Sequence, residues 1–219
     1  MTEPFLSTTT RDVPIQPARA ALLFIDVQNF SCHPDGAEWA LMTPEELTEK
    51  KAPFLNLMDR QVVPKMQALQ AACRNAGIEV MYTTIESLTK DGRDRSLDYK
   101  ITGFNIPKGS WDGKVIDAIA PEGDEIVLPK SSSSVFVSTH IDYILRNLGA
   151  QQLILSGVLT DQCVESAIRD ACDLGYLVTQ VTDACATFSQ QRQSASLNAI
   201  KGYCRQMTTS DLIAELGQA

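Results

Sequence analysis

Residues 20–25 read AALLFI, an uninterrupted apolar run just long enough for one β-strand. A strand without polar alternation is covered on both faces, as the strands of parallel sheets are. Further strand-length runs follow, and helical patterns separate them. This alternation predicts an α/β fold, a doubly wound (Rossmann-like) three-layer αβα arrangement around a mainly parallel six-stranded sheet. The other five strands are expected over residues 78–84, 125–128, 151–156, 176–182 and 204–209.

The stretches between these strands are expected to be helices where apolar residues recur at helical spacing, and loops elsewhere. Residues 28–53 are predicted to be a long irregular connection, of the kind that often forms a lid or a wall of a binding site. Residues 86–108 are predicted to be a polar loop. The expected helices cover residues 55–76, 110–119, 138–148, 163–174 and 190–203.

The chain has 219 residues and a net charge of −8, which suits one domain over residues 1–219. This negative charge repels nucleic acid and anionic membranes, so neither is expected as a partner. No apolar stretch approaches the ~20 residues of a membrane span. The six cysteines form no CxxC pair, which favours reduced thiols and a cytoplasmic protein. Residues 1–17 are rich in Thr and Pro without periodicity and are expected to form a surface arm.

Three expected strands end in a chemically useful group. Asp26 follows the first strand, Lys130 follows the third, and Cys163 follows the turn after the strand over residues 151–156. In open α/β sheets, ligands bind in the crevice at the carboxyl ends of the strands. Asp26 alone also suits a helix cap and Lys130 alone a solvated surface charge. Their coincidence at one sheet edge instead favours a functional site.

Cys163 stands where a turn leads into a helical pattern. The positive end of a helix dipole and its free N–H groups favour a thiolate, so this position predicts a lowered pKa and a nucleophile. The alternative is a small buried apolar residue, which most free cysteines are. A redox pair with Cys172 is disfavoured, because nine residues of helix separate the two cysteines by ~13 Å.

Several other chemistries lack their sequence patterns. The chain has no GxGxxG after its first strand and no GxxxxGK[ST], so a nucleotide-binding reading has no support. Its two histidines, His33 and His140, are too few for a histidine-rich metal site and leave no well-placed base for a Ser-His-Asp triad. Asp26 is therefore the candidate base for a nucleophile.

Substrate-binding residues are expected from the loops that border the crevice. Phe30 and Trp39 come from the first long connection, and Gln206 comes from the last strand. Tyr99 and the arginines at positions 93 and 95 are further candidates from the polar loop. Spacing alone does not decide among them.

Three motifs resemble the signature blocks of the isochorismatase-like cysteine hydrolases. They are FIDVQN at residues 24–29, LPK at residues 128–130, and the block of residues 157–170 in which Gly157, Thr160 and Cys163 stand three residues apart. Two further stretches, KGSWD at residues 108–112 and ILR at 144–146, are more similar to the ureidoacrylate and biuret amidohydrolase branch than to the nicotinamidases. Residues 85–95 lack the histidine of the nicotinamidase metal cluster.

This resemblance implies an amidohydrolase acting through a thioester. Asp26 would take the proton of Cys163, and Lys130 would hold thiolate and carboxylate by charge. The backbone N–H groups of Leu159 and Cys163 would form the oxyanion hole, with a cis peptide bond before Leu159. Ammonia would leave, and Asp26 would then activate water. The implied partner is a small amide or ureide, no cofactor or metal is expected, and the implied assembly is a homodimer or homotetramer.

Two other readings stay open. One is a different small-amide hydrolase of the same fold, N-carbamoyl or nicotinamidase-like. The other is a non-catalytic oligomeric scaffold in which Cys163 is structural. An oxygen-only metal site is a minor alternative, from carboxylates at positions 35, 38, 86 and 91.

Overall fold

The structure is a computed structural model and describes residues 10–217. The described residues form a six-stranded sheet in which all neighbouring strands are parallel, in the order β3-β2-β1-β4-β5-β6. This order winds outward from the centre in both directions, so the predicted doubly wound sheet is confirmed. The strands are β1 (Ala20–Ile25), β2 (Glu79–Ile85), β3 (Ile126–Lys130), β4 (Gln152–Val158), β5 (Leu177–Ala186) and β6 (Arg205–Met207).

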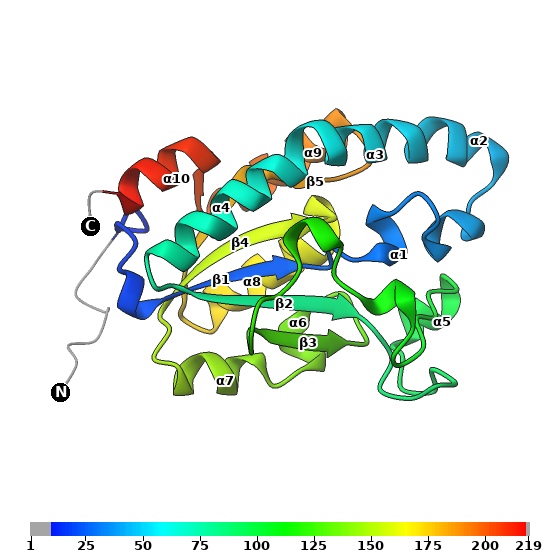
Figure 1. Cartoon of the computed structure of the whole chain (residues 1–219), viewed down its shortest axis with the longest axis horizontal. Coiled ribbons are helices and arrows are strands. Elements are labelled where there is room, and N and C mark those ends of the chain that lie inside the picture. Colours follow the sequence, from blue (N-terminus) through cyan, green and yellow to red (C-terminus); the bar gives the residue numbers. More distant parts are fainter. Residues whose placement is uncertain (1–9, 218–219) are drawn as a thin grey trace.

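Helices cover both faces of the sheet and give the fold three layers (Figure 1). Alternate residues of β1 face opposite layers: Leu22 and Phe24 belong to the core with α4 and α10, whereas Leu23 and Ile25 belong to the core with α7 and α8. Every residue of β1 is buried, which explains why its sequence has no polar alternation. The main helices are α4 (Val63–Asn75), α7 (Ile141–Asn147), α8 (Glu165–Asp173), α9 (Gln190–Ile200) and α10 (Thr209–Leu216).

The prediction of an irregular connection over residues 28–53 is wrong in its second half. From Pro44 to Asn75 the chain is helical, with α segments separated by two π-helical turns. Pro44 follows the extended Thr43 at the start of this run, where a missing N–H breaks no helical hydrogen bond. Pro53 and Pro64 instead each follow a π-helical turn within the run, and their missing N–H groups interrupt the helical hydrogen-bond ladder there. The run comprises α2 (Pro44–Glu46), a π turn (Leu47–Lys51), α3 (Ala52–Leu57), a second π turn (Met58–Val62) and α4.

Two predicted helices are also corrected. Residues 110–119 contain only two 3-10 turns, Trp111–Gly113 and Asp117–Ile119, because the backbone between them pairs as an antiparallel bridge, Gln28 with Val115. The helix predicted over residues 138–148 is two helices, α6 (Val135–Ser138) and α7. The polar loop over residues 86–108 contains the short helix α5 (Leu97–Ile101).

The chain before β1 is packed against the body where it is described. Ile15 is buried, and its backbone N–H donates to Glu215 Oε1 at 2.9 Å. Gln152 Nε2 donates to the Pro14 carbonyl at 2.9 Å. Residues 1–9 of the predicted surface arm lie outside the described residues. Within residues 10–217, no helix is long and apolar enough to cross a membrane.

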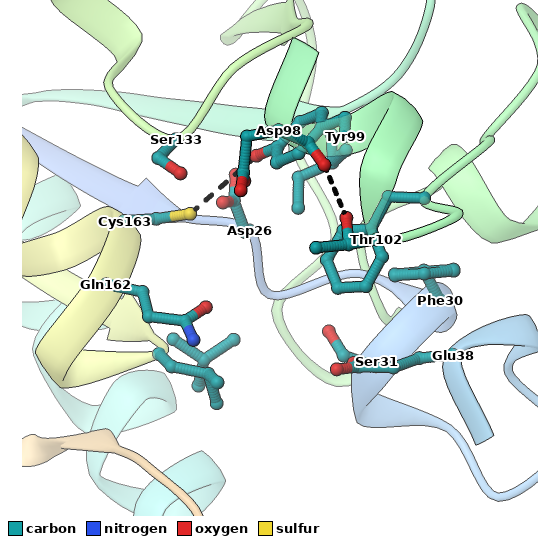
Figure 2. Close-up of a pocket in the computed structure, with 14 residues that line it drawn as sticks. Asp26, Phe30, Ser31, Glu38, Asp98, Tyr99, Thr102, Ser133, Gln162 and Cys163 are labelled. Carbon is teal, nitrogen blue, oxygen red and sulfur yellow. Dashed lines mark hydrogen bonds between the residues drawn. The ribbon is translucent and has the colours of Figure 1, made fainter. Parts of the chain in front are cut away.

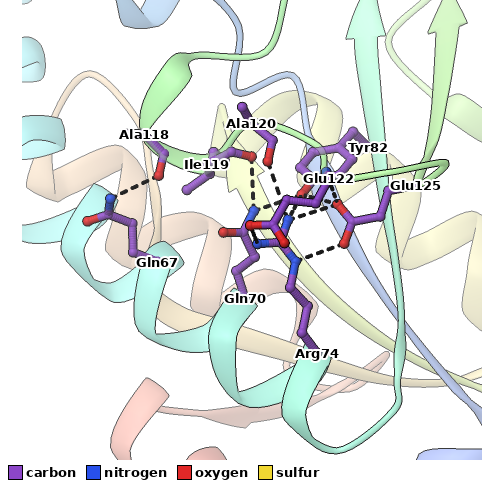
Figure 3. Close-up of polar contacts among 9 residues, drawn as sticks. All are labelled: Gln67, Gln70, Arg74, Tyr82, Ala118, Ile119, Ala120, Glu122 and Glu125. Carbon is purple, nitrogen blue, oxygen red and sulfur yellow. Dashed lines mark hydrogen bonds and ion pairs between the residues drawn. The ribbon is translucent and has the colours of Figure 1, made fainter.

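A polar network fastens α4 to the start of β3 (Figure 3). Arg74 donates from Nε and Nη2 to the two carboxylate oxygens of Glu125, at 2.8 and 2.9 Å. Its Nη1 donates to Glu122 Oε1 at 2.7 Å, and the Tyr82 hydroxyl donates to Glu125 Oε2 at 3.0 Å. This network therefore fixes the position at which β3 enters the sheet.

Candidate active site

The three candidate catalytic residues meet at one edge of the sheet. Asp26 directly follows β1, Lys130 ends β3, and Cys163 lies five residues beyond the end of β4. β1 and β4 are the neighbouring strands from which the chain winds in opposite directions. The carboxyl ends of such a pair border the crevice in which α/β sheets bind ligands. The sheet topology thus brings together residues that are up to 137 positions apart in the sequence.

The Lys130 ammonium lies at the centre of this cluster. Its Nζ is 2.8 Å from Asp26 Oδ2, and both side chains are almost fully buried, at 0% and 3% exposed. It also donates to Cys163 Sγ at 3.4 Å, to Tyr99 OH at 3.2 Å and to the Ser132 carbonyl at 2.9 Å. A lysine buried this deeply needs such compensation for its lost hydration. The ammonium therefore holds the carboxylate and the sulfur on either side of itself.

The Asp26 carboxylate is fixed, yet one of its oxygens has spare capacity. Thr83 Oγ1 donates to Asp26 Oδ1 at 3.0 Å, and the Asp26 N–H donates to the Thr83 carbonyl at 3.0 Å. Oδ2 accepts no hydrogen bond of regular geometry from the described residues, although it is paired with Lys130 by charge. The backbone of Asp26 has φ 57°, a left-handed conformation that aspartate tolerates better than most residues. Oδ2 is therefore available to accept a proton.

Cys163 is positioned by a tight connection after β4. The Val158–Leu159 peptide bond is cis, as the resemblance implied, and a π-helical turn over Thr160–Val164 then carries the cysteine into α8. Gly157 has φ 142°, and a Cβ there would lie 2.2 Å from the Ile25 carbonyl oxygen. Only glycine permits this approach of β4 to β1. It brings Cys163 close to the end of the strand that carries Asp26.

The protonation of the cluster differs from the sequence expectation. Burial raises the pKa of Cys163 to about 12, although the positive charge of Lys130 acts in the opposite direction. The lowered pKa predicted from the start of the helix is therefore wrong, because desolvation of the thiolate outweighs the favourable charges. Burial also disfavours the ammonium, but the negative charge of Asp26 outweighs it and raises the pKa of Lys130. Lys130 is charged at neutral pH and Cys163 is a thiol.

A cavity of about 340 Å³ opens onto Cys163 and Asp26 (Figure 2). Phe30 and Tyr99 line it, as the sequence suggested, and so do Leu159 and Cys163, the residues of the implied oxyanion hole. The arginines at positions 93 and 95 do not line it. This volume is at the small end of the range for ligand sites in proteins.

Trp39 and Gln206, which were expected to bind substrate, lie elsewhere. Trp39 is buried in the core against Phe54 and Phe188, and its Nε1 donates to the His33 carbonyl at 2.8 Å. Gln206 lies on β6 at the edge of the sheet, and its Nε2 donates to the Leu197 carbonyl at 2.9 Å. Neither lines the cavity. Both assignments are corrected. Each residue belongs to a segment that was expected to border the crevice, but this position in the sequence does not determine which way its side chain points.

Sequence reasoning missed several polar residues of the cavity. Glu38 is buried, at 6% exposed, and was considered only as a possible metal ligand. The adjacent residue Trp39 packs into the core. A large aromatic residue at this position is the sequence signal that could have placed the segment against the protein body. The other polar lining residues that were missed are Ser31, Asp98, Thr102, Ser133 and Gln162.

The side chains do not assemble a metal site in the described part of the chain. No group of three or more His, Cys, Asp or Glu residues there could hold a metal ion. Of the four carboxylates weighed for an oxygen-only site, Glu38 alone lines the cavity. The expected independence from metals and cofactors stays a prediction.

Comparisons with known proteins agree with this arrangement. The isochorismatase domain matches residues 20–211, so the chain belongs to the isochorismatase family. It is similar to the solved structure of a cysteine hydrolase from Pseudomonas syringae pv. phaseolicola, at 26% identity over 94% of this chain and 96% of that chain, with a TM-score of 0.77. The resemblance to isochorismatase-like cysteine hydrolases is confirmed.

A second solved structure, N-carbamoylsarcosine amidase from Thermoplasma acidophilum, is also 26% identical. The match covers 87% of this chain and 96% of that one, with a TM-score of 0.66. An isochorismatase family protein from Desulfovibrio vulgaris, at 23% identity, 91% and 98% coverage and a TM-score of 0.73, shows the same fold. The ureidoacrylate and biuret branch stays a prediction.

Proposed function

We propose that this protein is a cysteine-dependent amidohydrolase that cleaves a C–N bond of a small amide or ureide. The observation that carries this proposal is the buried cluster in which Lys130 lies 2.8 Å from Asp26 and 3.4 Å from Cys163 at the mouth of a cavity. A nucleophile, a base and a fixed positive charge are the groups that thioester chemistry requires. Membership of the isochorismatase family and the likeness to an amidase support it.

In the first half of the reaction, the Cys163 sulfur attacks the substrate carbonyl as its proton passes to Asp26 Oδ2. Because the pKa of Cys163 is raised, we expect this proton transfer to accompany the attack on the carbonyl rather than to precede it. Lys130 keeps its proton and stabilises the negative charge as it moves between sulfur and carboxylate. The backbone N–H groups of Leu159 and Cys163 would stabilise the oxyanion, since both residues line the cavity.

The second half restores the cysteine. Asp26 returns the proton to the leaving nitrogen, the C–N bond breaks, and ammonia departs from a thioester on Cys163. Asp26 then takes a proton from water as the water attacks the thioester, and the carboxylic product leaves as the sulfur regains a proton. One amide and one water give one acid and one ammonia, so no redox partner is needed.

The substrate is most simply a biuret-like or ureidoacrylate-like ureide, as the motifs at residues 108–112 and 144–146 indicated. An N-carbamoyl substrate is the second candidate, because one structural neighbour is named N-carbamoylsarcosine amidase. The cavity volume of about 340 Å³ suits either class. We also expect a homodimer or homotetramer in the cytoplasm.

Ammonia release from a panel of small amides, ureides and N-carbamoyl compounds tests this function. We expect at least one to be hydrolysed and Cys163→Ser to lower that turnover about a thousandfold or more, because a serine hydroxyl ionises far less readily than a thiol. Cys185→Ser, which replaces another buried cysteine, is the matched control and should stay active. Retained turnover in Cys163→Ser would show that Cys163 is not the nucleophile. Hydrolysis of none of the compounds by the wild-type protein would favour the scaffold reading, in which this cysteine is structural.

Chelation separates this function from that of a metal-dependent amidase. Exhaustive treatment with EDTA should leave turnover unchanged, since the proposed steps use Asp26, Lys130 and Cys163 alone. The measurement is ammonia release before and after chelation, followed by addition of zinc, manganese or magnesium. Loss of turnover on chelation and its recovery with one of these ions would contradict the cofactor-free mechanism.

A further inference from the structure

Glu38 is a buried acid that the proposed chemistry does not use. It is 6% exposed, it lines the cavity, and no described residue forms a hydrogen bond or ion pair with it. Figure 2 shows Glu38 beside Ser31, on the other side of the cavity from Cys163. Glutamate is almost never buried to this extent without a partner, since the carboxylate loses its hydration. The missing partner is therefore expected to come from a ligand.

The segment that carries Glu38 is held in place on both sides. A Cβ at Gly36 would lie 2.2 Å from the Phe30 carbonyl oxygen, so this glycine packs directly on α1 (Asn29–Cys32). The Ala37 N–H donates to Asp112 Oδ1 at 2.9 Å, and Trp39 is buried in the core. The backbone that carries Glu38 is therefore anchored immediately before and after this residue, at the wall of the cavity.

The nearby positive charges are engaged elsewhere. Lys50 acts on Glu38 electrostatically, but its Nζ pairs with Glu46 Oε1 at 2.6 Å. Lys130 is paired with Asp26. Asp26 and the exposed Asp98 add two further carboxylates to the lining, which contains no lysine or arginine. Burial raises the pKa of Glu38 to about 7, with Lys50 acting in the opposite direction.

We propose that Glu38 binds an N–H-donating group, an ammonium or an amide, at the end of the substrate remote from the scissile carbonyl. This inference rests on the proposed amidohydrolase function and adds the class of substrate. Glu38 and Cys163 lie on opposite sides of one small cavity, so a single ligand reaches both. The same carboxylate repels substrates that end in a carboxylate, so of the two ureides named above it favours the biuret-like one, which ends in an amide, over the ureidoacrylate-like one.

Four primary amides of matched length test the inference: β-alaninamide, succinamide, butyramide and succinamate. We expect the wild-type protein to hydrolyse the ammonium and diamide compounds at least tenfold faster, in kcat/KM, than succinamate. Glu38→Gln should lower kcat/KM for β-alaninamide about ten- to hundredfold, mainly through KM, because a charge-assisted hydrogen bond is lost. For succinamide, Glu38→Gln should lower kcat/KM less, since the glutamine side chain still accepts a hydrogen bond. For butyramide, kcat/KM should be unaffected. These differences distinguish an ammonium ligand from a neutral amide.

Glu49→Gln is the matched control, because this exposed glutamate on the neighbouring π turn does not line the cavity. It should leave the order of the four amides unchanged. The inference would be overturned if the wild-type protein hydrolysed succinamate as fast as β-alaninamide and succinamide, or if Glu38→Gln kept the wild-type order of the four amides. The amidohydrolase proposal would stay intact in either case.

A second readout does not depend on turnover. β-Alaninamide should slow the alkylation of Cys163 by iodoacetamide in the wild-type protein and not in Glu38→Gln, whereas succinamate should protect neither. Protection without hydrolysis of any amide would support the Glu38 site and contradict the proposed reaction. If the amides neither protect Cys163 nor are hydrolysed, both the Glu38 site and the proposed reaction are overturned.

Discussion

Two clusters of one cation and its carboxylates flank strand β3. At its start, Arg74 engages Glu125 through two hydrogen bonds of 2.8 and 2.9 Å, and the arginine is 22% exposed. At its end, Lys130 lies 2.8 Å from Asp26, and the lysine is completely buried. The Arg74 cluster is partly exposed and its donors are paired, whereas the Lys130 cluster is almost fully buried and leaves Asp26 Oδ2 without a regular hydrogen bond.

The difference separates a structural cluster from the cluster that we propose to be reactive. A planar guanidinium matches both oxygens of a carboxylate, which fixes geometry and leaves no acceptor free. A lysine ammonium is a point charge that attracts a carboxylate and a sulfur without saturating either. Spare acceptor capacity beside a thiol is destabilising in the resting protein, but it is what proton transfer requires. We therefore expect changes at the two ends of β3 to affect different properties.

The largest expected effect is that of Lys130→Met. Turnover should fall about a hundredfold or more, and alkylation of Cys163 should slow, because the charge that lowers the pKa of this thiol is removed. Unfolding free energy should also fall by about 3–5 kcal/mol, since Asp26 is left as a buried carboxylate without its partner. The measurements are ammonia release, iodoacetamide kinetics and urea denaturation.

The double variant Asp26→Asn, Lys130→Met provides the control for stability. It carries no unpaired charge, so it should recover most of the lost unfolding free energy and stay inactive. An alkylation rate for Cys163 that is the same in Lys130→Met as in the wild type would show that the ammonium does not act on the sulfur.

At the other end of β3, Arg74→Ala should affect stability alone. We expect a loss of about 2–3 kcal/mol, because Glu125 is only 16% exposed and loses both hydrogen bonds of its bidentate partner. Turnover at 25 °C should be unchanged. Arg146→Ala is the control: its ion pair with Asp142 is 57% and 36% exposed and should contribute less than about 1 kcal/mol. A fall in turnover for Arg74→Ala would mean that the position of β3 tunes Lys130.

The sequence predicted the reactive cluster well because sheet topology determines it. Apolar runs locate parallel strands, and the ends of parallel strands meet at one edge, so Asp26 and Lys130 were predicted to meet near Cys163 without knowledge of any contact. The Arg74 network was not predicted. It joins α4 to the loop before β3, and no periodicity relates those two segments.

The walls of the cavity were predicted less well for the same physical reason. Trp39 and Glu38 are adjacent in sequence, yet one packs into the core and the other lines the cavity. That choice depends on Gly36 packing against α1 and on Asp112, contacts between distant segments. Likewise, the spacing of apolar residues does not predict the π turns that precede Pro53 and Pro64.

The expected effect that depends most on pH concerns Glu38, which has neither kind of partner. Its folded pKa of about 7 lies above the ordinary value of about 4.3, so the folded state keeps a proton that the unfolded state loses as pH rises. Stability should therefore be undiminished below about pH 4, decline between about pH 4 and 7, and stay reduced above pH 7. The charge of Lys50 partly offsets the cost of ionising the buried Glu38. The other titratable groups coupled to this region are Cys32 and Asp26.

Glu38→Gln cannot ionise, so it should equal the wild type in unfolding free energy at pH 4 and exceed it by about 3 kcal/mol at pH 8. Urea denaturation across this range measures the difference, and Glu49→Gln, at an exposed site, should show none. Saturating β-alaninamide should raise the wild-type stability at pH 8 and leave that of Glu38→Gln nearly unchanged, since the ligand supplies the donor that the buried carboxylate lacks. A difference between variant and wild type that is constant from pH 4 to pH 8 would assign the effect to packing. In that case, ionisation of Glu38 would not be what destabilises the wild-type protein, and a bound substrate would not stabilise the protein by pairing with its carboxylate.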